Sequence, residues 1–311
     1  MGINEDFDKL WKDTFEAARH SWEEVLTADE REGGPSPWGN SKYQTFEQCP
    51  YLYWAMFIKR MKPKDPRPPL EIGGLFHEAR ARYYLKALEL EKTEVSDQEL
   101  NNACMEAGYD IINRAEKVVP ATAAEVRRLF QGWAVVFGPD TPKDDRFDTI
   151  GVEKLIEVNR GFPYSTRVDR IVAIEDKPAI LEIKTAGKRT KDMLAGYEMD
   201  SQFLGQQYCW RHSKWYRKYG SLKYYVVDLT IKTAEMVCVR EVVPISSKAM
   251  KDWEKAKRWT YAQMQQCEAY QYWPRIRANC VKYGRCGLTE HCAKMKANYW
   301  PGWVKKETGE Y

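Results

Sequence analysis

Two carboxylates stand close together in the stretch RVDRIVAIEDKPAILEIKT, residues 167–185. The β-rich runs on either side of Glu175 and Asp176 predict a β-hairpin whose turn is centred on these two residues. That register sets Asp169 opposite Glu182. Directly opposed side chains have Cβ atoms about 4.5–5.5 Å apart, and like charges there repel each other. The sequence therefore predicts a site at which something offsets the repulsion between two carboxylates.

A divalent cation can offset such repulsion, because carboxylate oxygens are hard ligands of the kind that Mg²⁺ and Mn²⁺ prefer. The alternative is a solvated lattice on an exposed sheet face, with Arg167 and Lys184 beside the two acids. The hairpin is apolar on both faces, which is typical of central, covered strands and favours the cation. Its apolar residues are Val168, Ile171, Val172, Ile180, Leu181 and Ile183.

The order of these residues, Asp in RVDRI and then Glu and Lys in LEIKT, resembles the signature of the PD-(D/E)xK nuclease superfamily. The resemblance implies that Asp169 and Glu182 hold one or more Mg²⁺ or Mn²⁺ ions, together with the backbone carbonyl of Ile183. It implies that Lys184 positions or activates the attacking water and stabilises charge at the phosphate. Metal coordination lowers the pKa of bound water and neutralises charge that develops in phosphodiester hydrolysis.

Two flanking segments resemble RecB-like members of that superfamily. GGLFHEA has the G-x-x-x-H spacing of Gly73 and His77, which implies that His77 is a third metal ligand rather than a packing or surface histidine. DSQFLGQQYCW lies where relatives carry Q-x-x-x-Y on a helix that supports the active site. Gln202 matches the glutamine, but Gln206 occupies the tyrosine position, and Tyr208 lies about 200° further around the helix. The alternative is an amphipathic helix that only packs on the sheet.

Four of the eight cysteines are arranged like the ligands of a metal centre. SKYQTFEQCPYLYW carries Cys49, and CVKYGRCGLTEHC supplies Cys280, Cys286 and Cys292. One early and three late cysteines resemble AddB, the CRISPR-adaptation exonucleases and their phage relatives, and imply a structural [4Fe-4S] cluster. A Cys₄ site for Zn²⁺ and unligated buried thiols are the alternatives. The cysteines expected in the core are Cys104, Cys209, Cys238 and Cys267.

Basic residues gather beside these elements in a pattern that suits the phosphates and stacked bases of single-stranded DNA. The basic segments are KRMKPKDPR at 59–67, KTAGKRTK at 184–191 and RHSKWYRKYG at 211–220. A solvated helix face is the alternative for each segment. The residues that we expect to contact the DNA backbone are Lys188, Arg189, Lys191 and Arg167.

The elements predict an α-rich first half and a β-rich second half. The expected helices are 3–28, 41–61, one beginning after Gly74, 97–117, 122–137, 198–218 and 247–270. Strands are expected in IGVEKLIEV, in both arms of the hairpin, in KYYVVDLTI and in EMVCVREVVPI. The resemblance implies an α/β restriction-endonuclease-like fold with a central mixed sheet flanked by helices. We expect a helical extension at 1–36, a nuclease domain with the cysteine module at 37–299 and a tail at 300–311.

Composition sets wider bounds on the function. A chain of 311 residues with 43% hydrophobic content can form a substantial core, and a net charge of +4 does not by itself indicate a nucleic-acid partner. The sequence contains no Walker-type phosphate loop, which disfavours ATP-driven chemistry. It contains no signal core or long apolar run, so we expect a cytoplasmic protein of a bacterial, archaeal or phage-infected cell, without membrane contact.

The resemblance implies a metal-dependent exonuclease that acts on single-stranded DNA ends. Any helicase, recombination protein or CRISPR adaptation protein would be a separate partner. One alternative is a nucleic-acid-binding or adaptor protein that keeps the nuclease fold without turnover. A structure-specific endonuclease is the other.

Overall fold

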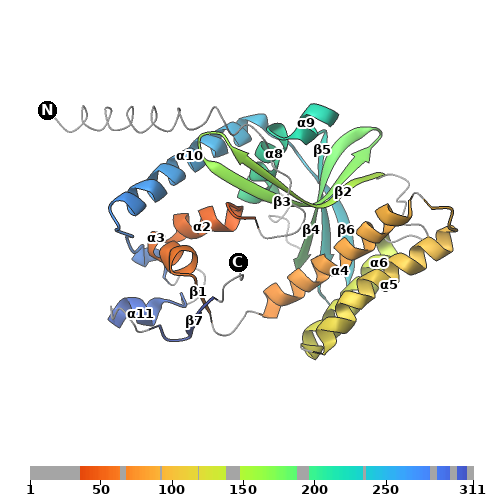
Figure 1. Cartoon of the computed structure of the whole chain (residues 1–311), viewed down its shortest axis with the longest axis horizontal. Coiled ribbons are helices and arrows are strands. Elements are labelled where there is room, and N and C mark those ends of the chain that lie inside the picture. The colour runs from red at the N-terminus through yellow and green to blue at the C-terminus, as the bar shows by residue number, and fades with distance from the viewer. Residues whose placement is uncertain are drawn as a thin grey trace.

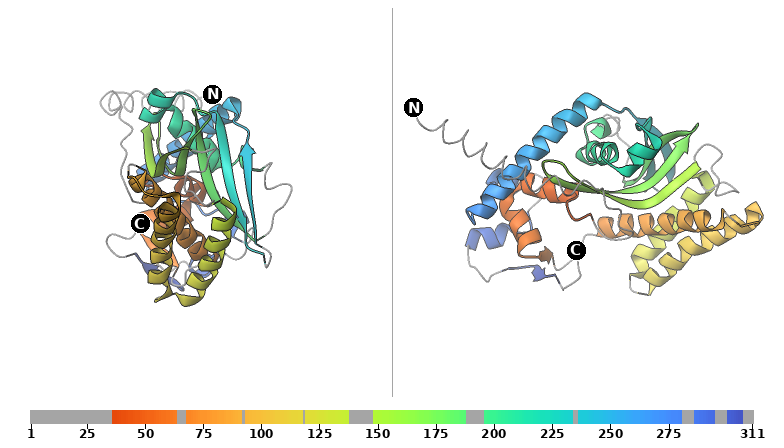
Figure 2. Two further views of the ribbon diagram at one scale, coloured as in Figure 1. Left: turned by 90° about the vertical axis from the view of Figure 1, so that its right-hand side faces the viewer. Right: turned by 45° about the horizontal axis from the view of Figure 1, so that its top comes forward.

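The computed structural model describes residues 36–63, 68–91, 93–117, 119–137, 148–187, 196–233, 236–280, 286–294 and 300–306. Within these ranges a five-stranded sheet carries helices on both faces (Figures 1 and 2). This arrangement confirms the predicted α/β class with a central sheet. The helix predicted for 3–28 lies outside the described residues.

The strand order places the hairpin in the middle of the sheet. The order is β2-β3-β4-β5-β6, in which β4 and β5 run parallel and all other neighbours are antiparallel. The connection from β4 to β5 contains helices α8 (Ser201–Arg211) and α9 (Lys214–Tyr219), as a parallel pair requires a crossover. The five strands are Asp148–Asn159, Pro163–Ile174, Lys177–Ala186, Tyr224–Ile231 and Val237–Val243.

The predicted register of the hairpin is confirmed. Glu175 and Asp176 both have positive φ, 49° and 61°, as a two-residue hairpin turn of type I′ requires. The pairing of β3 with β4 runs from the turn to Arg170 opposite Leu181 and ends there. Asp169 and Glu182 come next in this register, so they stand where the two strands stop exchanging backbone hydrogen bonds.

Helices cover both faces of the sheet, which explains why the hairpin is apolar on both sides. One face packs against α2 (Asn40–Gln48), α8 (Ser201–Arg211) and α10 (Ser247–Ala269). Its core includes Tyr43, Ile171, Ile180, Phe203, Tyr208, Tyr225 and Trp253. The other face packs against α4 (Pro68–Leu90), α5 (Asp97–Glu116) and α6 (Pro120–Phe137). That core includes Phe76, Leu100, Phe130, Trp133, Val172, Leu181 and Ile183.

Several predicted boundaries are wrong for local reasons. The helix predicted over 41–61 is interrupted at Cys49, whose backbone is extended because the residue before Pro50 is disfavoured in the helical region, and helical structure resumes at Pro50. Helix α4 begins at Pro68 and runs through Gly73 and Gly74. The helix predicted over 198–218 is divided at Ser213, whose side chain caps a new helix.

The smaller elements complete the described structure. They are α3 (Pro50–Tyr53), η1 (Trp54–Ile58), α9 (Lys214–Tyr219), η2 (Arg277–Asn279) and α11 (Thr289–Lys294), with strands β1 (Met61–Pro63) and β7 (Trp303–Lys305). Strand β7, in the segment that we assigned to a tail, pairs antiparallel with β1. Figure 1 shows α2, α3, α11 and this two-stranded sheet on one side of the molecule, away from α5 and α6.

Substitution of two helical glycines by alanine should change the stability of the protein in opposite directions. A Cβ on Gly108 of α5 would lie 2.3 Å from Cζ of Phe130 on α6, whereas a Cβ on Gly74 of α4 meets no atom within 4 Å. We expect Gly108→Ala to lower the free energy of unfolding by about 1–3 kcal/mol through overpacking. Gly74→Ala should raise it by up to about 1 kcal/mol through helix propensity. Chemical denaturation measures both, and equal effects would contradict the described packing of α5 on α6.

Candidate active site

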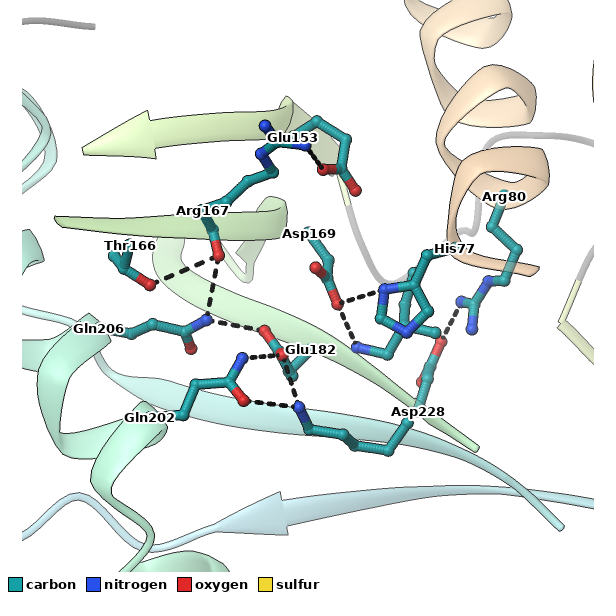
Figure 3. Close-up of polar contacts among 12 residues, drawn as sticks. His77, Arg80, Glu153, Thr166, Arg167, Asp169, Glu182, Gln202, Gln206 and Asp228 are labelled. Carbon is teal, nitrogen blue, oxygen red and sulfur yellow. Dashed lines mark hydrogen bonds and ion pairs between the residues drawn. The ribbon is translucent and has the colours of Figure 1, made fainter. Parts of the chain in front are cut away.

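The predicted catalytic side chains converge from four elements (Figure 3). Asp169 lies on β3, Glu182 and Lys184 on β4, His77 on α4 and Gln202 on α8. Asp169 is 7% exposed and Glu182 is 1% exposed. Two carboxylates are therefore buried at the point where the hairpin ladder ends.

Asp169 is held by the backbone of the neighbouring strand and by His77. Its Oδ2 accepts a hydrogen bond from the backbone N–H of Ile183 at 2.7 Å and lies 3.6 Å from Nδ1 of His77. Burial raises the pKa of Asp169, but His77 and the Ile183 N–H outweigh burial and keep the pKa below its usual value. Burial lowers the pKa of His77, and Asp169 more than reverses this effect. The hydrogen-bonded ladder of β3 and β4 thus ends in a contact with the Asp169 side chain. Binding of a metal ion by the Ile183 carbonyl stays a prediction.

Glu182 accepts hydrogen bonds from three side chains. Its Oε1 lies 2.9 Å from Nζ of Lys184 and also accepts from the amide of Gln202, while its Oε2 accepts from Nε2 of Gln206 at 2.8 Å. Gln202 in turn accepts from Lys184 at 2.8 Å. Burial raises the pKa of Glu182 and Asp169 adds to the rise; Lys184 and Gln206 oppose it without cancelling it. Glu182 therefore remains undercompensated for its burial.

Helix α8 presents both glutamines because of where it begins. The Asp200 side chain caps the helix by accepting from the backbone N–H of Gln202 at 2.7 Å. Gln202 and Gln206 lie four residues apart and so share one helix face. This spacing brings two amide donors to the same carboxylate.

A third acidic residue, Glu153, belongs to this cluster and was missed in the sequence. The pairing of β2 with β3 joins Val152 to Arg170 and Lys154 to Val168, which sets Glu153 opposite Asp169. Its φ of 50° is uncommon for a non-glycine residue and follows a bulge between Thr149 and Gly151. Burial, and then Asp169, raise the pKa of Glu153 to about 8. The available signal was an acid in the predicted strand IGVEKLIEV, which precedes the strand that carries Asp169.

Arg167 lies beside this third acid. Its Nη1 is 3.5 Å from Oε2 of Glu153, and its backbone carbonyl accepts from Nε2 of Gln206 at 3.3 Å. The side chain is 32% exposed, so one guanidinium could meet both Glu153 and a ligand outside. Contact of Arg167 with DNA stays a prediction.

The chemistry of the donor set fits a hard divalent cation. Three carboxylates and one imidazole lie together, and the pKa values of Glu182 and Glu153 are raised by burial and by the nearby Asp169 carboxylate, so a cation among them would relieve the repulsion. As the side chains stand, no three His, Cys, Asp or Glu residues in the described ranges form a ready-made metal centre. The residues that would hold Mg²⁺ or Mn²⁺ are Asp169, Glu182, Glu153 and His77.

A buried ion network fixes α4, and with it His77, against the sheet. Nη2 of Arg80, one helical turn after His77, lies 2.8 Å from Oδ2 of Asp228 on β5. Arg240 on β6 contacts the other oxygen of Asp228 at 2.6 Å. The Arg80 guanidinium is also 4.5 Å from the ring centroid of Trp133 on α6. Removal of one partner from such a buried network leaves uncompensated charge, so the network disfavours sliding of α4.

The cysteine module joins segments that are far apart in the chain. Asn279 donates to the backbone carbonyl of Gln48 at 2.6 Å, and the Tyr51 hydroxyl lies 2.8 Å from Nε2 of His291. These contacts set Cys49 against the segment that carries the three late cysteines. The first turn of α3 is therefore tied to α11.

The four cysteines of the module approach one another without forming a finished site. The backbone N–H of Cys286 donates to the carbonyl of Cys280 at 2.7 Å. Burial raises the pKa of Cys292, a hydrogen bond from Arg275 opposes this rise, and nearby Cys286 and Cys49 add to it. All eight cysteines are free thiols. Of the other four, Cys104 and Cys209 are buried, and Cys238 and Cys267 pack against the two cores, as expected.

Lys188, Arg189 and Lys191, predicted to contact DNA, lie outside the described residues. Within the described ranges, no helix has the length and apolar character needed to cross a membrane.

Because its pKa is raised, Glu153 should lower the folding stability of the metal-free protein at high pH, and Glu153→Gln should restore that stability. Between about pH 4.5 and 8 the folded state keeps the Glu153 proton that the unfolded state loses, so folding stability falls as pH rises. An amide cannot ionise. We expect Glu153→Gln to stabilise the protein at pH 8 by on the order of 2 kcal/mol more than at pH 5, measured by denaturant unfolding in chelator.

The matched control for this prediction is Glu157→Gln, on the same strand but paired with Ser165 rather than with Asp169. A gain that does not depend on pH, or one that is the same for both substitutions, would show that Glu153 is not held among buried carboxylates.

Comparison with known proteins places this geometry in a family. A protein from Eubacterium rectale described as a candidate exonuclease is similar, with 11% identity and a TM-score of 0.46 over 85% of this chain and 89% of that chain. The protein SSO0001 is similar with 17% identity and a TM-score of 0.27 over 64% and 90%. Comparison with curated proteins gives no match. The model of the PD-(D/E)XK nuclease superfamily matches residues 37–293, and the chain therefore belongs to this superfamily.

Proposed function

We propose that this protein is a metal-dependent DNA exonuclease that acts on single-stranded ends. One observation carries the proposal: Asp169, Glu182, Lys184 and His77 come together at one buried point of the sheet. Membership of a nuclease superfamily supports the same reaction class. The resemblance to RecB-like and AddB-like nucleases, and to the CRISPR-adaptation exonucleases, supports the preference for ends.

In this proposal the acidic residues bind the metal ion and Lys184 contacts the phosphate. A bound Mg²⁺ or Mn²⁺ would supply a water of lowered pKa and Lewis-acid stabilisation of the phosphate. Asp169 and Glu182 would hold it, with His77 and Glu153 beside them. Burial lowers the pKa of Lys184, but Glu182 and Asp169 raise it above its usual value, so the amine stays protonated. Lys184 therefore serves as a cation and hydrogen-bond donor toward the phosphate and is a poor general base.

The basic surface proposed for DNA lies next to this site in the chain. Lys188, Arg189 and Lys191 directly follow β4, which carries Glu182 and Lys184. Helix α9 adds exposed basic residues and the partly exposed Tyr216, an aromatic ring of the kind on which unpaired bases stack. We propose that these residues and Arg167 neutralise the phosphates of the incoming strand.

We propose that Cys49, Cys280, Cys286 and Cys292 hold a structural [4Fe-4S] cluster, with Zn²⁺ as the alternative occupant. The supporting observations are the contacts that join the Cys49 segment to the late cysteines and the proximity of Cys49 and Cys286 to Cys292. A metal at this point would link segments from opposite ends of the described chain and stabilise the fold.

Loss of the Asp169 carboxylate should abolish cleavage. We expect Asp169→Asn to reduce the Mn²⁺-dependent digestion of linear single-stranded DNA by at least about 100-fold, because an uncharged amide cannot balance the positive charge of the metal ion. Asp252→Asn, on the exposed surface of α10, is the matched control and should digest DNA like the wild type. Equal rates for wild type and Asp169→Asn would remove the catalytic claim for this site, whereas no digestion by either protein would favour a binding or adaptor protein without turnover.

Circular single-stranded DNA in the same assay distinguishes an exonuclease from an endonuclease. An exonuclease that requires ends leaves the circle intact while it degrades the linear strand. Cleavage of the circle at a comparable rate would instead establish an endonuclease.

The cysteine proposal predicts a visible absorbance. Anaerobically purified protein should show a broad band near ~400 nm from thiolate-bound iron–sulfur, and Cys49→Ser should lose both the band and thermal stability. Cys267→Ser, a partly buried cysteine outside the module, is the control and should keep the band. A colourless wild type that contains one equivalent of zinc would assign Zn²⁺, and a metal-free, stable wild type would remove the metal from the account.

A further inference from the structure

A buried tyrosine on β5 reaches the active site through Gln206. The Gln206 side chain is fully buried, and its Nε2 donates to Oε2 of Glu182 at 2.8 Å and to the backbone carbonyl of Arg167 at 3.3 Å. On the other side of the same amide, Oε1 accepts a hydrogen bond from the hydroxyl of Tyr225. Tyr225 is also fully buried, and its ring centroid lies 4.5 Å from that of Phe203.

The donors and acceptors allow one orientation of this amide. The Glu182 carboxylate and the Arg167 carbonyl can only accept hydrogen bonds, so the NH₂ group of Gln206 must face them. A turned amide would set its oxygen against both acceptors in a buried site, where unpaired polar groups are strongly disfavoured. The amide oxygen must therefore face Tyr225, and the Tyr225 hydroxyl must donate.

We propose that Tyr225 and Gln206 form a positioning pair for Glu182. The Tyr225 hydroxyl locks the amide of Gln206, and the locked amide holds the Glu182 carboxylate in place for the cation. Oε1 of Glu182 accepts hydrogen bonds from Lys184 and Gln202. Oε2 accepts one from Gln206 and keeps a lone pair for a ligand. This inference rests on the proposed function and explains how the Glu182 carboxylate is held for the metal ion.

The pair acts on the site through a single chain of contacts. The Tyr225 hydroxyl donates to Gln206 and Gln206 donates to Glu182, so we expect the effect of Tyr225 on the carboxylate to pass through this amide. Chains of buried hydrogen bonds strengthen one another, and a double-mutant cycle measures such dependence directly. A polar contact that only fastened α8 to the sheet would change stability without changing affinity for a metal.

Mn²⁺ alone is the probe for this inference. The full chain is titrated with Mn²⁺, and the signal of free Mn²⁺ is followed by electron paramagnetic resonance for wild type, Tyr225→Phe, Gln206→Met and the double variant. We expect each single substitution to weaken the affinity by about 10–100-fold, as for partners that orient metal ligands. The double variant should be no weaker than Gln206→Met, because Tyr225 acts through the amide.

Tyr208→Phe is the matched control. Its hydroxyl lies on the same helix as Gln206 but donates to the backbone carbonyl of Arg160 at 3.4 Å, away from Glu182. The control should bind Mn²⁺ like the wild type. Circular dichroism verifies folding of each variant, and Gln206→Met carries the test if Tyr225→Phe does not fold.

The outcomes separate this inference from the proposed function. Wild-type affinity in Tyr225→Phe or Gln206→Met, or additive losses in the double variant, would overturn the positioning pair even if the wild type digests DNA. Loss of affinity in these variants supports the pair even if the wild type binds Mn²⁺ without digesting DNA, a result that contradicts the nuclease proposal alone. A wild type that binds no Mn²⁺ would overturn the pair.

Discussion

Three buried or half-buried carboxylates held side by side raise the free energy of the folded chain unless positive charge lies close to them. Each forms an ion pair: Asp169 with His77, Glu182 with Lys184 and Glu153 with Arg167. The compensation is incomplete, because the pKa values of Glu182 and Glu153 stay above their usual range. A further cation among these carboxylates would complete the compensation, and this proposed ion links the fold to its chemistry.

The surrounding structure keeps these groups from moving apart. The two central strands are covered on both faces, so the carboxylates cannot turn into water without disturbing a core. The Arg80–Asp228 contact fixes α4 one turn from His77, and the positive-φ backbone of Glu153 is flanked on both sides by residues of β2 that pair with β3. Sparsely populated backbone conformations of this kind cost about 1–3 kcal/mol and concentrate at functional sites.

Local patterns predicted much of this site, and long-range geometry explains the rest. The turn at Glu175 and Asp176 determined the hairpin register, so the positions of Asp169 and Glu182 followed from the sequence. Glu153 did not follow, because its place depends on a bulge in β2 that shifts the register with β3. The clamp between α4 and β5 and the reach of Tyr225 to α8 depend on packing between elements distant in sequence. The match to the nuclease superfamily confirms the family but not the subfamily, which remains part of our proposal.

The most direct test of a cation among these carboxylates is anomalous X-ray diffraction from crystals grown with Mn²⁺. The account predicts an anomalous peak within coordinating distance, about 2.0–2.3 Å, of oxygens from both Asp169 and Glu182. Calcium is a suitable comparison because it binds the same oxygens. An ordered site without a peak at saturating Mn²⁺, with His77 and Lys184 still paired to the two acids, would contradict the central claim.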